Sequence, residues 1–218
     1  MSSFLHRYTT SFVAAASTGL CASQSLASAG NLTLNGSLVS SGVGIMDAAR
    51  RVGITSAGND SSVVWTITGT DRNGNTLTEN LNGGNAVLVQ SVNDFLTVTS
   101  IYGSAATAST VTAGTTSVGS SAPVAIDYVS NPNFVSVGIS FDSTGANATI
   151  EVTNDNPGPK GDFLGNTPVW FPATNLQSIS TNTLQIVQGP ITMMRTTINS
   201  GTGVVTTRTC QSFVAGNI

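Results

Sequence analysis

The strongest constraint on the fold is a strict alternation of apolar and polar residues that is interrupted by turn sequences. Val63, Trp65 and Ile67 are separated by Val64, Thr66 and Thr68. This period of two is typical of a strand with one buried face, because successive side chains of a strand point to opposite sides of the sheet. Residues 63–68 are therefore predicted to form a half-buried strand.

A turn signal follows this strand directly. Residues 71–75 read DRNGN, and the dipeptide Asn-Gly tolerates the positive φ angles of a tight hairpin turn. The alternation then resumes over residues 77–81. Asp71, Asn73 and Asn75 also alternate as the oxygen ligands of calcium loops do, but the glycine falls between the second and third of them. We therefore interpret the segment as a hairpin turn without a metal.

The same alternation recurs along the chain, so the fold class follows from it. Three further faces are predicted: Phe95, Thr97, Thr99 and Ile101; Val135, Val137, Ile139 and Phe141; and Ala148, Ile150 and Val152. A strand is also predicted to start at Arg51, and IMDAARR (45–51) could form one helical turn. No stretch predicts a long amphipathic helix. We expect an all-β fold, an antiparallel β-sandwich of the jelly-roll or immunoglobulin-like kind.

The 218 residues suffice for one large β domain or two small ones. The run VGSSAP, residues 118–123, is the natural seam because glycine, serine and proline interrupt regular structure there. We expect four parts: an N-terminal arm over residues 1–30, a first β module over 31–118, a linker over 119–123 and a second β module over 124–218.

The N-terminal segment resembles a secretion signal in outline, with Arg7 before an apolar run and a small-residue site at 27–29. Ser17, Thr18 and Gly19 interrupt that run, so we expect no cleaved signal peptide. An arm that is kept must be covered, either by a partner subunit or by its own domain. Its candidate assembly contacts are Phe4, Leu5, Tyr8, Phe12 and Val13.

A second candidate contact region is the segment GPKGDFLGNTPVWFPATN, residues 158–175. Loops of this length in a compact domain usually have a function or are ordered by a partner. The segment carries Phe163, Trp170 and Phe171, whose rings are costly to leave in water. They either cap the core of the second module or contact a neighbouring subunit.

The composition indicates a protein that is packed against others. Charged residues make up 8% of the chain, whereas about 25% is usual for a soluble domain. Low charge gives little electrostatic self-repulsion and poor protection against association. The net charge of −3 with seven basic residues argues against a nucleic-acid partner. The pair Arg50-Arg51 is interpreted as a solvated strand start, and no apolar run is long enough to span a membrane.

The chain offers little that could perform chemistry. Its one histidine, His6, lies in the arm, so a Ser-His-Asp triad has no oriented base. Cys21 and Cys210 are expected to be free thiols and lack the spacing of a zinc site. Glu79 and Glu151 are the one acid pair considered for glycoside hydrolysis, and we do not assign them that role. We expect no enzyme activity and no catalytic, metal-binding or cofactor-binding residues.

Several phrases resemble a group of tailed-bacteriophage virion structural proteins. In the first half these are AGNLTLNG, RRVGITSAGNDSSVVWTITGTDRNGNTLTE and FLTVTSIYGSAATASTVTAGT; in the second half they are DYVSNPNFVSVGISF, IEVTNDNP and INSGTGVV. The resemblance covers most of the chain and contains no catalytic motif.

The resemblance implies a structural virion protein, and we expect a capsid decoration or cement protein that stabilises the head by binding between capsomers. Its partners would then be the major capsid protein or neighbouring virion subunits, in a homo-oligomer for which a trimer is favoured by lattice symmetry. Its location would be the virion head surface, after synthesis in the host bacterial cytoplasm. Two alternatives stay open: a neck or tail component, such as a ring or sleeve subunit, and a module that binds host glycans through Trp170 and Phe171.

Overall fold

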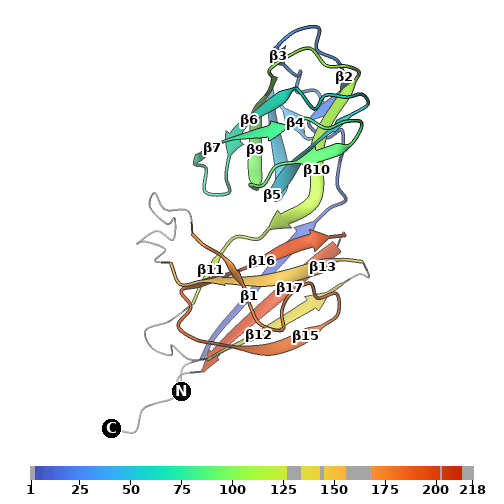
Figure 1. Cartoon of the computed structure of the whole chain (residues 1–218). Coiled ribbons are helices and arrows are strands. Elements are labelled where there is room, and N and C mark those ends of the chain that lie inside the picture. Colours follow the sequence, from blue (N-terminus) through green and yellow to red (C-terminus); the bar gives the residue numbers. More distant parts are fainter. Residues whose placement is uncertain (1–2, 127–133, 143–144, 156–167, 202, 213–218) are drawn as a thin grey trace, which may run out of the picture. The chain divides into compact units, whose positions relative to one another are not determined.

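The structure is a computed structural model of the chain, shown in Figure 1. It describes residues 3–126, 134–142, 145–155, 168–201 and 203–212, with the backbone alone for residues 3–12 and Ser212. The described residues form strands, turns and loops and contain no helix. The sheets are built from antiparallel pairs such as Ser3–Phe12 with Gly203–Ser212, Asn147–Thr153 with Met193–Ser200, and Val64–Thr70 with Thr76–Asn82. The predicted all-β sandwich class is thus confirmed.

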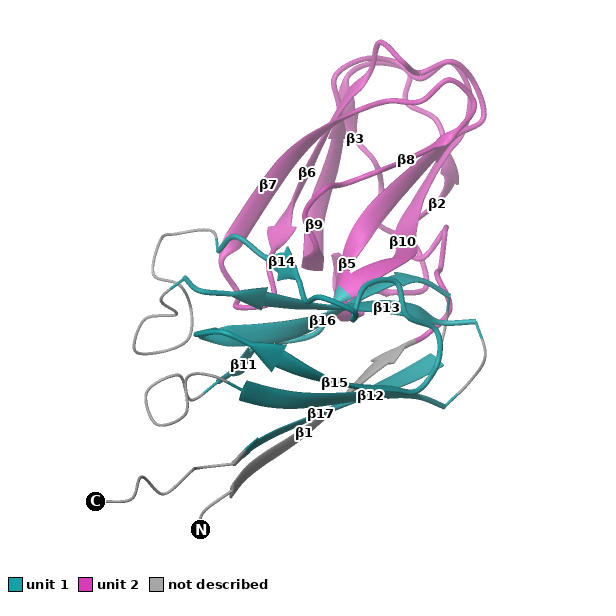
Figure 2. Ribbon diagram, turned by 60° about the horizontal axis from the view of Figure 1, so that its bottom comes forward, with its two compact units in different colours: residues 1–12, 120–218 teal, residues 13–119 magenta. Residues whose placement is uncertain are grey.

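The chain divides into two compact units, coloured separately in Figure 2. Unit 2 consists of residues 13–119, and unit 1 combines residues 1–12 with residues 120–218. The boundary at Gly119 and Ser120 falls at the start of the expected linker 119–123. It does not fall in a loop, because a strand continues to Ser120.

Unit 2 contains nine strands. They are β2 (Cys21–Gln24), β3 (Gly30–Asn31), β4 (Val39–Ser40), β5 (Val43–Ser56), β6 (Val64–Thr70), β7 (Thr76–Asn82), β8 (Leu88–Gln90), β9 (Phe95–Gly103) and β10 (Val111–Ser120). Neighbouring strands follow the order β10-β5-β9-β6-β7, with β2 paired to β10, β3 to β9, and both β4 and β8 to β5. The strands enclose one core cluster of buried side chains, which includes Leu20, Val52, Ile54 and Ile101.

The hairpin β6–β7 forms as the sequence predicts. Val63, Trp65 and Ile67 are buried in the core of unit 2. In the turn, Gly74 has a φ of 83°, and the Asp71 carboxylate accepts hydrogen bonds from the backbone N–H groups of Asn73 and Asn75. The asparagine and glycine pattern is accounted for by these turn contacts.

Strand β9 departs from the expected face. The pairing with β6 shifts between Thr68↔Ser100 and Gly69↔Val98, so Thr99 is an extra residue in β9. Such a bulge moves the side chains on one side of it to the other face. Val98 is therefore buried and Thr99 exposed, and the prediction that Thr99 shares a face with Phe95 is wrong.

Residues 45–51 belong to the long strand β5 and do not form the helical turn that was considered. The pairing of β5 with β9 is irregular between Ile45 and Arg50. This irregularity lets Asp47 and Arg50, three residues apart, meet on one side of the chain.

Unit 1 is a sandwich of two sheet layers (Figure 2). One layer has the order β1 (Ser3–Phe12), β17 (Gly203–Ser212), β12 (Phe134–Phe141), β15 (Thr183–Gln188). The other contains β14 (Phe171–Pro172), β13 (Asn147–Thr153) and β16 (Met193–Ser200) in that order, with β11 (Val124–Ala125) paired to β16. Buried side chains fill the space between them, including the predicted Val135, Val137, Ile139, Ala148 and Ile150.

The expected arm is split between the two units. Residues 3–12 form β1, which pairs with β17 of the same chain from Ser3↔Ser212 to Phe12↔Gly203. Residues 13–30 belong to unit 2. A separate arm is not formed, because the N-terminal residues complete a sheet and thereby satisfy their backbone hydrogen bonds.

Candidate assembly surface

The outer face of the four-stranded sheet carries three large apolar side chains in the open. Phe134 of β12 is 52% exposed, and Leu184 and Ile186 of β15 are 70% and 62% exposed. We call these three residues the outer-face patch. The register pairs Leu184 with Gly138 and Ile186 with Ser136, so small residues of β12 lie beside them. Exposed apolar clusters of this kind mark interaction surfaces in soluble proteins.

The strand that carries most of the patch is also the end strand of its sheet. β15 pairs with β12, and no other described strand pairs with it. Its outer backbone edge therefore has N–H and C=O groups that the sheet does not satisfy, and β15 has no lysine, proline or charged residue to block addition of another strand. The patch and the open edge together form the candidate assembly surface.

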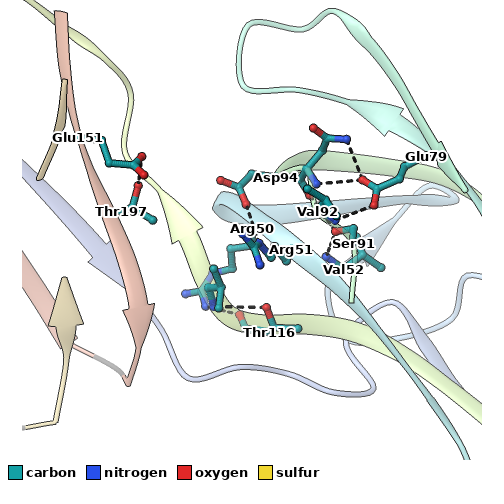
Figure 3. A network of polar contacts seen from close by, with 12 residues as sticks. Arg50, Arg51, Val52, Glu79, Ser91, Val92, Asp94, Thr116, Glu151 and Thr197 are labelled. Atoms are coloured by element: carbon teal, nitrogen blue, oxygen red, sulfur yellow. Dashed lines mark hydrogen bonds and ion pairs between the residues drawn. The ribbon is translucent and has the colours of Figure 1, made fainter. Parts of the chain in front are cut away.

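Of the predicted contact residues in segment 158–175, Trp170 and Phe171 are described, whereas Phe163 lies outside the described residues. The guanidinium of Arg195 lies 4.5 Å from the centre of the Trp170 ring. Arg195 Nε donates to Glu151 Oε2 at 2.7 Å. Thr197 Oγ1 donates to the same oxygen at 2.8 Å (Figure 3). Phe171 is 57% exposed, so its ring does not cap the core of unit 1.

The predicted contacts of the arm have different surroundings. Val13 is exposed and begins unit 2. Phe4, Leu5, Tyr8 and Phe12 lie on β1, where their backbone pairing is described and their side chains are outside the described part of the structure.

Unit 2 has an exposed apolar region of its own, next to β8. Val87, Leu88 and Val92 are each more than half exposed. The Glu79 carboxylate fixes the loop there, because it accepts hydrogen bonds from the backbone N–H groups of Val92 and Asn93 at 2.6 and 2.9 Å (Figure 3).

Arg50 is the residue for which the prediction of a solvated side chain is wrong. It is not solvated at a strand start, since its side chain is completely buried in unit 2. Its guanidinium donates to both Asp47 carboxylate oxygens at 2.7 and 2.6 Å, to the Thr116 carbonyl and to the Val13 carbonyl. The neighbouring Arg51 pairs with Asp94 at 4.0 Å (Figure 3). The spacing of Asp47 and Arg50 was the available signal in the sequence. In a regular strand, residues three apart point to opposite faces, so there was no reason in the sequence to expect this pair or the burial of Arg50.

The described thiols and carboxylates that could take part in a reaction do not lie together in one site. Burial raises the pKa of the Cys21 thiol to about 12, which leaves it protonated, and Cys210 is an exposed free thiol on β17 in the other unit. Glu79 and Glu151 also belong to different units, and each is bound by groups of its own unit. Among the described residues, no three metal-ligating side chains cluster. The same residues contain no helix that is long and apolar enough to cross a membrane.

Comparison of the chain with protein-family models, with curated proteins and with solved structures finds no match. The function must therefore be argued from the surface and from the composition.

Proposed function

We propose that the chain is a structural virion protein of a tailed bacteriophage, and specifically a capsid decoration protein that stabilises the head by binding between capsomers. The outer-face patch carries this proposal. A monomer that stayed free would expose Phe134, Leu184 and Ile186 to water, with few charges to prevent association. A neighbouring virion subunit that covers the patch removes that exposed surface.

The composition and the fold support the same role. β-sandwich units with few charged residues suit a permanent place in a lattice, because low surface charge favours association. The phrase-by-phrase resemblance to phage virion proteins supports the class of particle. The partner is then the major capsid protein or another copy of this chain, and lattice symmetry sets the stoichiometry.

The copy number in purified virions tests the proposal. Quantitative mass spectrometry against the major capsid protein should give on the order of hundreds of copies per particle, because capsomer contacts repeat over the lattice. About a dozen copies or fewer would place the protein in the neck or tail and overturn the decoration role. Absence from particles would overturn the virion role altogether.

The outer-face patch is tested by a charge placed on it. Ile186→Asp should leave the unfolding midpoint nearly unchanged, since exposed substitutions usually shift stability by less than about 0.5 kcal/mol. It should lower incorporation into particles at least about tenfold, because a carboxylate would have to be desolvated at the interface. Thr174→Asp, at an exposed position of unit 1 outside the patch, is the matched control and should be incorporated normally. Equal incorporation of both variants would exclude the patch as the contact.

A further inference from the structure

Strand β1 stands in an unusual position in the chain. It belongs to unit 1, yet the residues that follow it form the whole of unit 2 before the chain returns to unit 1 at Ser120. In its sheet β1 is an end strand, and β17 is its neighbour over ten paired positions. An end strand with one neighbour can be replaced by the same strand of another copy without the loss of any type of contact.

The chain is anchored immediately after β1 by contacts that belong to unit 2. The backbone N–H of Val13 donates to Asp47 Oδ2 at 3.1 Å, and the Val13 carbonyl accepts from Arg50 Nη2 at 2.7 Å. Because Arg50 is fully buried, this clamp is firmly held. It does not depend on which β17 strand the preceding residues pair with, so the junction of Phe12 and Val13 can serve as a hinge.

The register shows what β1 supplies to its sheet. Phe4 and Tyr8 are paired with Gln211 and Thr207, which are both buried residues of β17. In this register, these two positions of β1 therefore fall opposite buried positions of β17. Without β1, the ten paired residues of β17 would lose the strand beside them, and a strand of identical sequence restores that pairing in full.

We propose that in the assembled state β1 pairs with β17 of a second copy of this chain, so that exchanged strands link neighbouring subunits. This inference deepens the proposed virion role and rests on it for the setting in which copies meet. Exchange replaces each intramolecular pair by an identical intermolecular pair, so the local protein concentration and the hinge decide between the two forms.

A disulfide that can form only between two chains tests the exchange. The register sets Leu5 opposite Cys210, and directly opposed residues of antiparallel strands are close enough for a disulfide. A tagged Leu5→Cys/Cys210→Ser chain is co-expressed with the untagged wild-type chain, and the assembled protein is oxidised. Neither chain can form this bond within itself, and Cys21 is buried and does not compete. A covalent heterodimer that reductant cleaves is expected on a denaturing gel.

The control is a Phe4→Cys/Cys210→Ser chain, because position 4 is paired with Gln211 and not with Cys210. This chain should give no heterodimer. The single variant Leu5→Cys carries both thiols in one chain. Loss of free thiols with a monomer band on a denaturing gel without reductant reports the alternative, an intrachain bond. If that intrachain bond forms and the mixture gives no heterodimer, the exchange is wrong. If no disulfide forms in either sample, the register itself is wrong and the inference falls with it.

The two proposals fail separately. A heterodimer in purified protein that is absent from virions would leave the exchange standing and overturn the proposed function. Abundant protein in virions with only the intrachain disulfide would leave the function standing and overturn the exchange.

Discussion

Asp47 and Arg50 form the contact on which unit 2 should depend most at the level of single residues. Arg50 is fully buried and lies 2.6 Å from Asp47, whereas Arg51 is 34% exposed and lies 4.0 Å from Asp94. Removal of one partner from a buried ion pair leaves an uncompensated charge, and this costs about 3 kcal/mol or more.

Asp47→Asn should therefore lower the free energy of unfolding by about 3 kcal/mol in a urea titration, whereas Asp94→Asn should lower it by about 1 kcal/mol or less. If Asp47→Asn does not fold, the double variant Asp47→Asn/Arg50→Met should recover a folded unit 2, since it removes the isolated charge. Equal effects of the two single variants would contradict the importance of the buried pair.

The buried thiol of Cys21 should make the free energy of unfolding depend on pH in the alkaline range. Its folded pKa of about 12 lies above its ordinary value of 9.0. The unfolded chain therefore releases this proton first, so the contribution of the neutral thiol to stability is complete below pH 9 and is lost as the pH rises toward 12. The loss is about 1.4 kcal/mol per pH unit within that window.

Cys21→Ala provides the reference for this effect, because other groups also titrate at high pH. The difference in unfolding free energy between the wild type and Cys21→Ala should be constant up to pH 9 and then shrink. A difference that stays constant up to pH 11 would show that Cys21 is not the group responsible.

At the level of the elements, the β6–β7 turn depends on the backbone conformation of Gly74. Its φ of 83° disfavours any residue with a Cβ, and no heavy atom would lie within 4 Å of an added methyl group. Gly74→Ala should therefore destabilise unit 2 by about 1 kcal/mol through backbone strain alone. Gly30→Ala, in β3 of the same unit and without a positive φ, is the matched control for thermal unfolding. Equal melting temperatures would contradict the strained turn.

The elements also show where inference from sequence ends. The alternation at residues 63–68 and the Asn-Gly turn are local signals, and β6 and β7 follow from them. The partner of β1 is at the opposite end of the chain, and a pairing over that separation leaves no periodic trace. The bulge at Thr99 likewise depends on the neighbouring strand.

The candidate surface shows the same limit. In β15 one face carries Leu184 and Ile186, and the other carries Thr183, Gln185 and Val187, so the period of two favours burial of the face that the structure leaves exposed. The aromatic residues of segment 158–175 led to Trp170 and Phe171 as predicted contacts, whereas the outer-face patch was not predicted. The second sheet of unit 1 packs against the face of β15 that carries Val187, and this packing decides which face is buried.

At the level of the whole molecule, the two units differ in their dependence on the N-terminus. The core cluster of unit 2 is contributed entirely by residues within 13–119. A fragment of residues 13–119 should therefore fold alone and melt in one cooperative transition. A fragment of residues 120–218 lacks β1, so β17 has an open edge, and we expect it to melt at a lower temperature or to aggregate.

A peptide of residues 1–14, added to the fragment 120–218, should restore the missing strand and raise its melting temperature. A ligand that binds the folded state stabilises it by about 2.7 kcal/mol at a concentration 100 times its Kd, so the rise should depend on peptide concentration. A peptide with Phe4, Tyr8 and Phe12 replaced by serine should have a much weaker effect, because it lacks the large apolar residues of the strand, two of which are paired with the buried Gln211 and Thr207. If the fragment is as stable without the peptide as the full chain is, β1 contributes little to unit 1. In that case an exchange of β1 between copies would not hold an assembly together.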